Sequence, residues 1–255
     1  MLSSVHNLTG IGEWVGGGQD AILVYHAVGD STSAELFGQI SVERFSADLS
    51  NLIEKYEIVP LEELLVPSDS PRVALTFDDG LASVHSTVLP LLREFEAPAT
   101  VFVTPGFIDD RNREMLLRKH GIDSDNRIIL TEAEVFDLVD DPLVTIGNHS
   151  LTHTNLSAVC SPEKLHREIV ESRNQLEDRF GIDVTAFSYP YGAVNEPAKE
   201  LVESTHDISV TTKPYLLMSP TSGHQLPRIP GHVSPKQLSW ELTPLSDHVN
   251  TIRYR

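Results

Sequence analysis

Strand-like and helix-like segments alternate along the 255 residues of this chain, and this alternation limits the folds that it can adopt. Short apolar runs predict strands at 21–28, 73–77, 99–103, 143–147, 183–189, 207–212 and 225–229. Stretches with helical spacing of apolar residues lie between several of these runs. This order predicts βα units around a parallel sheet. Six or seven such units predict one (β/α) barrel domain at 21–255, after an N-terminal extension at 1–20.

Capping signals mark where the predicted helices begin and end. An N-cap side chain accepts hydrogen bonds from the first free N–H groups, and glycine readily takes the left-handed conformation that ends many helices. These signals stand at Ser41, Thr131 with Glu134, Ser161 with Pro162, and Gly181. Pro90 is expected in the first turn of a further helix, because a missing N–H costs no hydrogen bond there.

The charge balance argues against two classes of partner. The chain has 19 lysine and arginine residues against 37 aspartate and glutamate residues, which gives a formal net charge of −18. Nucleic acids and anionic membranes bind basic surfaces, so neither is expected as a partner. No apolar run reaches the ~18 residues of a membrane span, and the first residues lack the basic and apolar regions of a secretory signal. We therefore expect no membrane span and a cytoplasmic location.

Two adjacent aspartates, Asp78 and Asp79, directly follow the predicted strand 73–77 and precede Gly80. Like charges side by side repel each other, so the pair needs a compensating positive charge. A divalent cation bound by one carboxylate would supply that charge and would leave the other carboxylate to act as a base. The alternative is structural, because an aspartate can also cap a helix by accepting backbone N–H groups.

Two histidines, His149 and His153, follow the predicted strand 143–147 at a spacing of four residues. On a helical turn this spacing places both imidazoles on one face, close enough to bind one ion. Alone the pattern is weak, since such histidines are often ordinary surface or core residues. Together with one aspartate they would form a facial triad that leaves coordination positions open for water and substrate. The only cysteine, Cys160, can form neither an internal disulfide nor a thiolate cluster.

At these two motifs the sequence resembles the polysaccharide deacetylases of carbohydrate esterase family four. Thr76-Phe77-Asp78-Asp79-Gly80 looks like the first motif of that family, and His149-Ser150-Leu151-Thr152-His153 looks like the second. The resemblance runs from Tyr25-His26 to about Arg228. It implies an α/β fold, a single distorted (β/α) barrel with mostly parallel strands. It also implies that Asp79, His149 and His153 bind a divalent metal, zinc first with cobalt or nickel as alternatives. Asp78 is implied to be the catalytic base.

The third motif departs from the pattern of the family. The usual Arg-x-Pro-Tyr reads here as Ser188-Tyr189-Pro190-Tyr191. The resemblance implies that the N–H of Tyr191 helps to hold the oxyanion, whereas the arginine that orients the base is missing.

A similar branch of the family carries Tyr-His-x-Val near the start and Leu-Pro-Arg-Ile near the end, and both are present at 25–28 and 226–229. Arg228 is therefore the candidate for the missing cation, and its guanidinium is expected within hydrogen-bonding distance of Asp78. A purely structural salt bridge is the alternative.

The last family motif, a Leu-x-His that supplies the catalytic acid, is not cleanly present. His232, four residues after Arg228, is the first candidate, and His26 and His224 are held in reserve. Histidine suits this role because its pKa lies near the working pH. The sequence leaves the choice among these histidines, water and another group open.

The implied reaction is metal-assisted removal of an N-acetyl group from an N-acetylated sugar or polysaccharide. The metal would lower the pKa of a bound water towards ~7 and polarise the acetyl carbonyl. Two alternatives stay open: a C–N hydrolase that acts on a small cyclic amide or imide, and a non-catalytic pseudoenzyme that binds glycan. The pseudoenzyme stays an alternative because one arginine and one histidine of the family pattern are missing or displaced.

Overall fold

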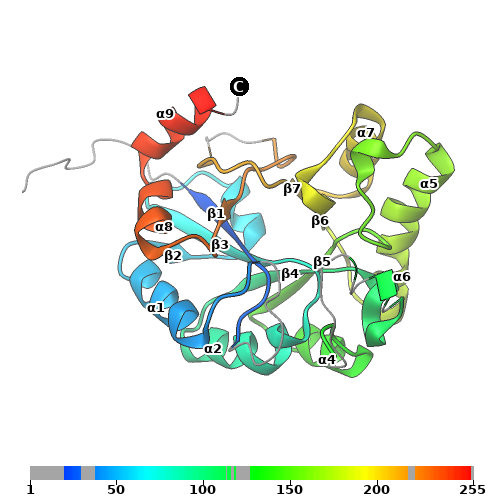
Figure 1. The fold of residues 1–255 in the computed structure, drawn as a ribbon, viewed down its shortest axis with the longest axis horizontal. Coiled ribbons are helices and arrows are strands. Elements are labelled where there is room, and N and C mark those ends of the chain that lie inside the picture. The colour runs from blue at the N-terminus through cyan, green and yellow to red at the C-terminus, as the bar shows by residue number, and fades with distance from the viewer. Residues whose placement is uncertain are drawn as a thin grey trace, which may run out of the picture.

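A parallel sheet curls into a distorted barrel at the centre of the molecule, and helices pack around its outer side (Figure 1). The computed structural model describes residues 20–29, 38–112, 114, 115, 118, 127–217 and 222–253. The strands are β1 (Ala21–Tyr25), β2 (Glu57–Ile58), β3 (Arg72–Phe77), β4 (Ala99–Val103), β5 (Val144–Asn148), β6 (Ala186–Ser188), β7 (Ile208–Val210) and β8 (Ile229–Pro230). Their order is β7-β6-β5-β4-β3-β1-β8, with β2 beside the start of β3, and these strand pairs are parallel. The predicted fold class is confirmed.

Helices fill most of the connections between the strands. The α-helices are α1 (Val42–Ile53), α2 (Leu89–Glu94), α4 (Glu132–Val139), α5 (Pro162–His166), α6 (Ser172–Phe180), α7 (Glu196–Thr205), α8 (Pro235–Glu241) and α9 (Pro244–Arg253). Two π-helical turns, η2 (Val84–Val88) and η5 (Arg167–Glu171), run directly into α2 and α6. Short 3-10 turns form η1 (Leu61–Leu65), η3 (Pro105–Asp110), η4 (Leu156–Ala158) and η6 (Pro190–Gly192).

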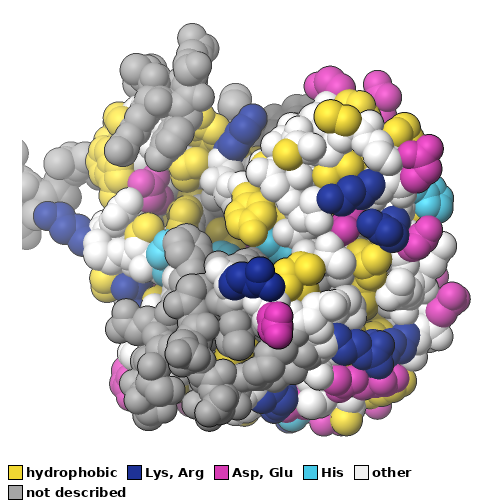
Figure 2. All heavy atoms as spheres, turned by 45° about the vertical axis from the view of Figure 1, so that its right-hand side comes forward, with side chains coloured by type: hydrophobic (Ala, Val, Ile, Leu, Met, Phe, Trp, Pro, Cys, Tyr) yellow, Lys and Arg dark blue, Asp and Glu magenta, His cyan; other side chains and the backbone are white. Residues whose placement is uncertain are grey.

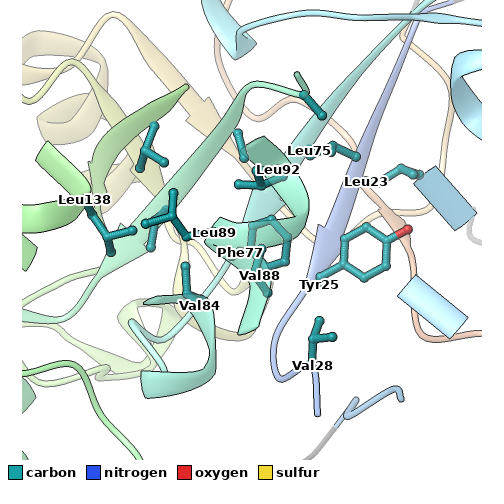
Figure 3. Close-up of a cluster of buried hydrophobic side chains, with 14 of the residues drawn as sticks. Leu23, Tyr25, Val28, Leu75, Phe77, Val84, Val88, Leu89, Leu92 and Leu138 are labelled. Carbon is teal, nitrogen blue, oxygen red and sulfur yellow. The ribbon is translucent and has the colours of Figure 1, made fainter. Parts of the chain in front are cut away.

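Side chains alternate between the two faces of the sheet, and this alternation separates two apolar cores. Leu23 and Tyr25 of β1 and Leu75 and Phe77 of β3 pack outward, against side chains of η2, α2 and α4 (Figure 3). The inward set is also apolar: Ile22, Ala74, Phe102, Ala186, Ile208, Val210 and Leu226. Asp78 follows Ala74 at an even spacing, so it belongs to the inward register at the carboxyl end of β3.

An extended segment after β7 connects the two edges of the sheet. Leu226 exchanges backbone hydrogen bonds with Ser209 and Thr211, both at 2.8 Å. Three residues later β8 begins and pairs with β1, and Gly231 donates to the carbonyl of Val24 at 2.9 Å. Arg228 lies between these two contacts, and its side chain shares the inward register of Leu226. The segment therefore delivers a cationic side chain into the barrel.

The predicted caps are present. The Ser41 hydroxyl accepts from the N–H of Arg44 at 3.2 Å. Thr131 and Glu134 form a reciprocal capping box, with distances of 3.3 and 2.8 Å. Gly181 ends α6 in the left-handed conformation, at φ 69°. These signals were readable in the sequence because each cap bonds to a residue at most four positions away.

Other boundaries differ from the prediction. The two-residue strand β2 was not predicted, because a pair of residues carries no periodicity. Pro90 lies in the first turn of α2, as predicted, but helical structure begins before α2 with the π turn η2, in which the N–H of Leu89 bonds to the carbonyl of Val84, five residues back. A π turn is wider than an α turn, which gives room to a proline ring that would clash inside a regular helix. The strand predicted at 225–229 is shorter, with an isolated bridge at Leu226 before β8.

The predicted N-terminal extension at 1–20 lies outside the described residues except for Asp20, so this boundary stays a prediction. Within the described ranges, no helix combines the length and apolarity needed to cross a membrane.

Candidate active site

The two sequence motifs meet at the carboxyl end of the barrel strands. Asp78 and Asp79 follow β3, His149 follows β5, and Tyr191 follows β6. Carboxyl ends of parallel strands lie at one edge of a sheet, which is where barrel enzymes place their reactive groups. Figure 2 shows histidine side chains in a hollow of the described surface, with hydrophobic and charged side chains around it. The sequence motifs thus form one site.

Three side chains converge as a candidate metal centre. The Nε2 atoms of His149 and His153 lie 3.5 and 3.3 Å from Oδ1 of Asp79, and all three residues are buried. Their ligand atoms lie within 4.8 Å of one another. Two imidazoles and one carboxylate are a donor set that suits zinc and related divalent ions. This is the group expected from the sequence.

The hydrogen bonding of His149 fits a metal ligand. Its Nδ1 lies 2.8 Å from the carbonyl oxygen of Ser188, which can only accept, so Nδ1 carries the proton. In the neutral ring the lone pair is then on Nε2, the atom that faces Asp79. Such a carbonyl behind a ligating histidine is the usual device that fixes its tautomer. The residues present therefore fit a bound divalent metal.

The backbone is unusual at four positions of this site. Asp79, Ser150, His153 and Tyr191 have φ values of 75°, 62°, 53° and 61°, in the left-handed region that non-glycine residues rarely adopt. Each such residue costs about 1–3 kcal/mol and persists only where its surroundings hold it. Their clustering around the candidate metal centre shows that the loops are constrained there.

Asp78 is held by a bidentate ion pair. Nη1 and Nη2 of Arg228 donate to its two oxygens at 2.8 and 2.7 Å, and the Ser188 hydroxyl donates at 3.2 Å. Burial alone would raise the pKa of Asp78, but the charge of Arg228, helped by His149, lowers that pKa well below its usual range. Asp78 is therefore an ionised and oriented carboxylate beside the candidate metal centre.

The contact expected between Arg228 and Asp78 is present, and the guanidinium is fully satisfied. Besides Asp78, its N–H groups reach Thr211 O at 2.8 Å, Thr76 Oγ1 at 3.1 Å and Ser188 Oγ at 2.9 Å. All five donors of the group therefore have an acceptor. The guanidinium also lies 5.7 Å from the ring centroid of Phe102. Ser188 is small, so the space that an arginine would fill at that position is open to Arg228.

Tyr191 lies over the candidate metal centre. Its ring meets that of His153 edge-on, with centroids 4.6 Å apart, and its side chain is 57% exposed. Partial burial and the negative charge of Asp79 raise the pKa of its phenol. The hydrogen bonds of turn η6 come from Gly192 and Ala193, at 2.8 and 3.1 Å, so they do not use the N–H of Tyr191.

The three histidines considered as the catalytic acid lie in different surroundings in the structure. The rings of His26 and His232 lie 6.5 Å apart, and the charge of His26 contributes to the lowered pKa of Asp78. Burial, and then His26, lowers the pKa of His232. His224 instead lies beside Ser209, with its Nδ1 3.4 Å from the hydroxyl oxygen. The structure thus places His26 close enough to influence Asp78, and places His232 beside His26.

The sequence reasoning missed two groups that support this site. Ser188 was noted only as a missing arginine, yet it contacts both Asp78 and Arg228. Glu168, which is 1% exposed, was not singled out, although its carboxylate binds the loop that carries His153. Its position on one face of a helix gave no signal, because glutamate is common on exposed helix surfaces.

Comparison with known proteins agrees with the site. The family described as polysaccharide deacetylase matches residues 66–207, more than half of the chain. YxkH of Bacillus subtilis, named as a polysaccharide deacetylase, is 24% identical over 76% of this chain and 64% of its own length. The chitooligosaccharide deacetylase of Rhizobium leguminosarum bv. trifolii is 32% identical over 46% of this chain and 44% of its own length. The chain thus spans less than two thirds of these relatives.

Solved structures share the fold. The deacetylase PplD of Streptococcus pyogenes superposes with a TM-score of 0.73 at 21% identity, over 90% of this chain and 100% of its own. The segment matched by the family includes the candidate metal ligands and ends before Arg228. On the strength of this match and the motifs within it, the chain belongs to the polysaccharide deacetylase family.

Proposed function

We propose that this protein is a metal-dependent hydrolase that removes N-acetyl groups from an N-acetylated sugar or polysaccharide. One observation carries the proposal: a buried Asp78, paired with Arg228, lies beside an Asp79–His149–His153 group whose ligand atoms face one another. A fixed base next to a divalent metal site is the arrangement that amide hydrolysis needs. Family membership and the name of the Rhizobium relative support the choice of an acetamide as the bond cleaved.

Asp79, His149 and His153 would hold the metal, with zinc as the first choice and cobalt or nickel as alternatives. When bound, the metal would supply Lewis-acid activation of water and of the acetyl carbonyl. The carbonyl of Ser188 keeps the lone pair of His149 on Nε2, ready for the ion. The donor set itself therefore supports a divalent metal as cofactor.

Asp78 is the proposed base. It takes a proton from the water as the water oxygen bonds to the acetyl carbon. The Tyr191 N–H, which the turn η6 leaves unused, is the proposed donor to the oxyanion, and one such donor is worth about 3 kcal/mol. The C–N bond then breaks, a proton passes to the leaving nitrogen, and the products are acetate and a free amine.

The proton donor to the leaving nitrogen is proposed to be His232, with His26 as its neighbour and competitor. The two rings are neighbours, with centroids 6.5 Å apart, and Gly38 lies against both: a Cβ there would approach the Nδ1 atoms of His232 and His26 to 3.2 and 3.5 Å. His232→Gln and His26→Gln separate the two. The variant that loses the basic limb of the kcat profile identifies the acid.

Acetate release from a panel of N-acetylated monosaccharides, chitooligosaccharides and a small cyclic imide tests the proposal. Activity on an N-acetylated sugar that a chelator abolishes, and that zinc or cobalt restores, is the expected result. Full activity in the metal-free protein would overturn the mechanism. Cleavage of the imide alone would support the cyclic-amide alternative, and metal binding without turnover would support the pseudoenzyme. The cytoplasmic location expected from the sequence stays a prediction.

A further inference from the structure

The loop that carries His153 is tied to a carboxylate outside the metal ligands. Glu168 lies in the π turn η5, and its side chain is 1% exposed. Its Oε2 accepts from the N–H of Thr152 at 2.9 Å, and its Oε1 accepts from the Thr152 hydroxyl at 2.7 Å. The hydroxyl of Thr154 also donates to Oε1, at 3.2 Å. These bonds flank His153 on both sides.

The π turn adds backbone contacts to the same loop. The N–H of Ser172 bonds to the carbonyl of Ile169, whereas a regular α-helix would pair it with Glu168, four residues earlier. The Glu168 carbonyl instead accepts from the N–H of Leu151, at 3.0 Å. π turns within helices recur at functional sites, and here the turn presents Glu168 to the histidine loop.

A second set of bonds fixes the other end of the loop. The Asn148 side chain donates to the carbonyl of Ile169 at 3.0 Å and accepts from the Ser172 hydroxyl at 2.7 Å and the Ser150 N–H at 3.0 Å. His149 follows Asn148 directly. The same helical segment therefore holds the chain on both sides of the two histidines.

Such fixation is needed because the loop is strained. Ser150 and His153 both have φ above 50°, at 62° and 53°, and released chain would relax from these values. If His153 turned, its Nε2 would leave the position 3.3 Å from Asp79.

From this arrangement we propose that Glu168 is a positioning residue that holds the His149–His153 loop in its metal-binding conformation. The inference rests on the proposed metal site. A buried carboxylate whose hydrogen bonds go to residues on either side of a ligand acts on that ligand as an outer-shell partner does. It needs no contact with substrate.

The test is cobalt binding by the full chain, followed by the visible absorption of Co²⁺ and without substrate. Glu168→Ala is expected to weaken cobalt affinity by about 10–100-fold, the usual cost of losing an outer-shell partner. Glu168→Gln is expected to stay close to wild type, because its oxygen can accept from the Thr152 N–H while its NH₂ donates to the two threonine hydroxyls. Glu171→Ala, an exposed glutamate in the same π turn, is the matched control and should bind as wild type does.

Unfolding of the metal-free proteins separates positioning from simple stability. A lower Tm for Glu168→Ala with unchanged cobalt affinity would show a structural role only and would overturn the proposal. If Glu168→Ala does not fold, Thr152→Val is measured in its place. This variant removes the Thr152 hydroxyl that donates to Glu168 and keeps the Thr152 N–H. Wild-type cobalt affinity in Thr152→Val would contradict the inference. A wild-type chain that binds no cobalt also overturns it. A chain that binds cobalt and releases no acetate refutes the proposed reaction alone.

Discussion

At the scale of single residues, two adjacent aspartates receive different surroundings. Asp79 faces two imidazoles, whereas Asp78 faces the guanidinium of Arg228. The left-handed conformation of Asp79, at φ 75°, turns its side chain away from the direction of its neighbour. The two carboxylates are therefore neighbours in sequence with different proposed roles, Asp79 as a metal ligand and Asp78 as the base. Single substitutions should show different effects on metal content and on turnover.

Asp79→Ala and His153→Ala should each lose bound metal together with activity, because each removes a proposed ligand. Asp78→Asn should keep the metal and lose turnover by about 10²–10⁴-fold, because only the base is removed. Metal content by elemental analysis and kcat for the same samples check the pair. An empty site in Asp78→Asn would mean that the two roles are exchanged.

Arg228→Ala should lower kcat strongly with metal content unchanged, because Asp78 loses the group that orients it. Removing one partner of a buried ion pair also costs about 3–5 kcal/mol of stability, so Arg228→Lys, which keeps the charge but loses the bidentate fork, is measured beside it. Arg228→Lys should recover part of the activity. In the Asp78→Asn background, Arg228→Ala should add little, since the two act as a unit. Arg93→Ala, an exposed arginine paired with Asp141, is the control.

At the scale of elements, the contact between β4 and β5 positions an aromatic ring against the guanidinium of Arg228. Gly147 of β5 lies against the ring of Phe102 of β4, and a Cβ at that position would approach the ring to 2.4 Å. The same ring lies under Arg228. The glycine thus provides the space in which Phe102 and Arg228 stack.

Gly147→Ala should therefore disturb both stability and catalysis. Overpacking of this kind costs about 1–3 kcal/mol, and displacement of the ring should move Arg228 from Asp78. Urea unfolding and kcat measured together check this. Wild-type kcat in a destabilised Gly147→Ala protein would show that Phe102 can yield without affecting the ion pair.

At the scale of the whole molecule, a buried histidine makes stability depend on pH. His206, after α7, packs on Phe187 with ring centroids 5.1 Å apart and lies 3.3 Å from the Asn148 amide. Burial, then the charge of Arg173, lowers its pKa to about 3. The unfolded chain, with a pKa near 6.5, binds more protons between these values. Stability from His206 is therefore present above about pH 6.5 and is lost as the pH falls towards 3.

Substitution of His206 by Gln should flatten the loss of stability between pH 6.5 and 4, by a few kcal/mol at most. The free energy of unfolding in urea, measured across this range, is the check. His166→Gln changes a histidine whose side chain is 56% exposed and should keep the wild-type slope. An unchanged slope in His206→Gln would assign the acid sensitivity to other groups.

The sequence alone determined those features that depend on near neighbours. Strand–helix alternation predicted the barrel, capping patterns predicted helix ends, and the motifs at 76–80 and 149–153 identified the group that the structure brings together. Each depends on residues a few positions apart, whose spacing shows in the chain itself.

Only the tertiary structure decided how the supporting residues are brought into contact with that group. The resemblance at 226–229 predicted that Arg228 pairs with Asp78. The geometry of that contact comes from the segment before β8, which hydrogen-bonds to β7 and then to β1 and so sets an inward register for a residue 150 positions away. Glu168 lies in the π turn η5, 16 positions after Thr152, and reaches the histidine loop through tertiary packing. Such contacts depend on strand register and on how the elements pack. Side chains alternate direction along a strand, so a shift of register by one residue would turn Arg228 to the other face of the sheet. A local sequence pattern does not fix that register.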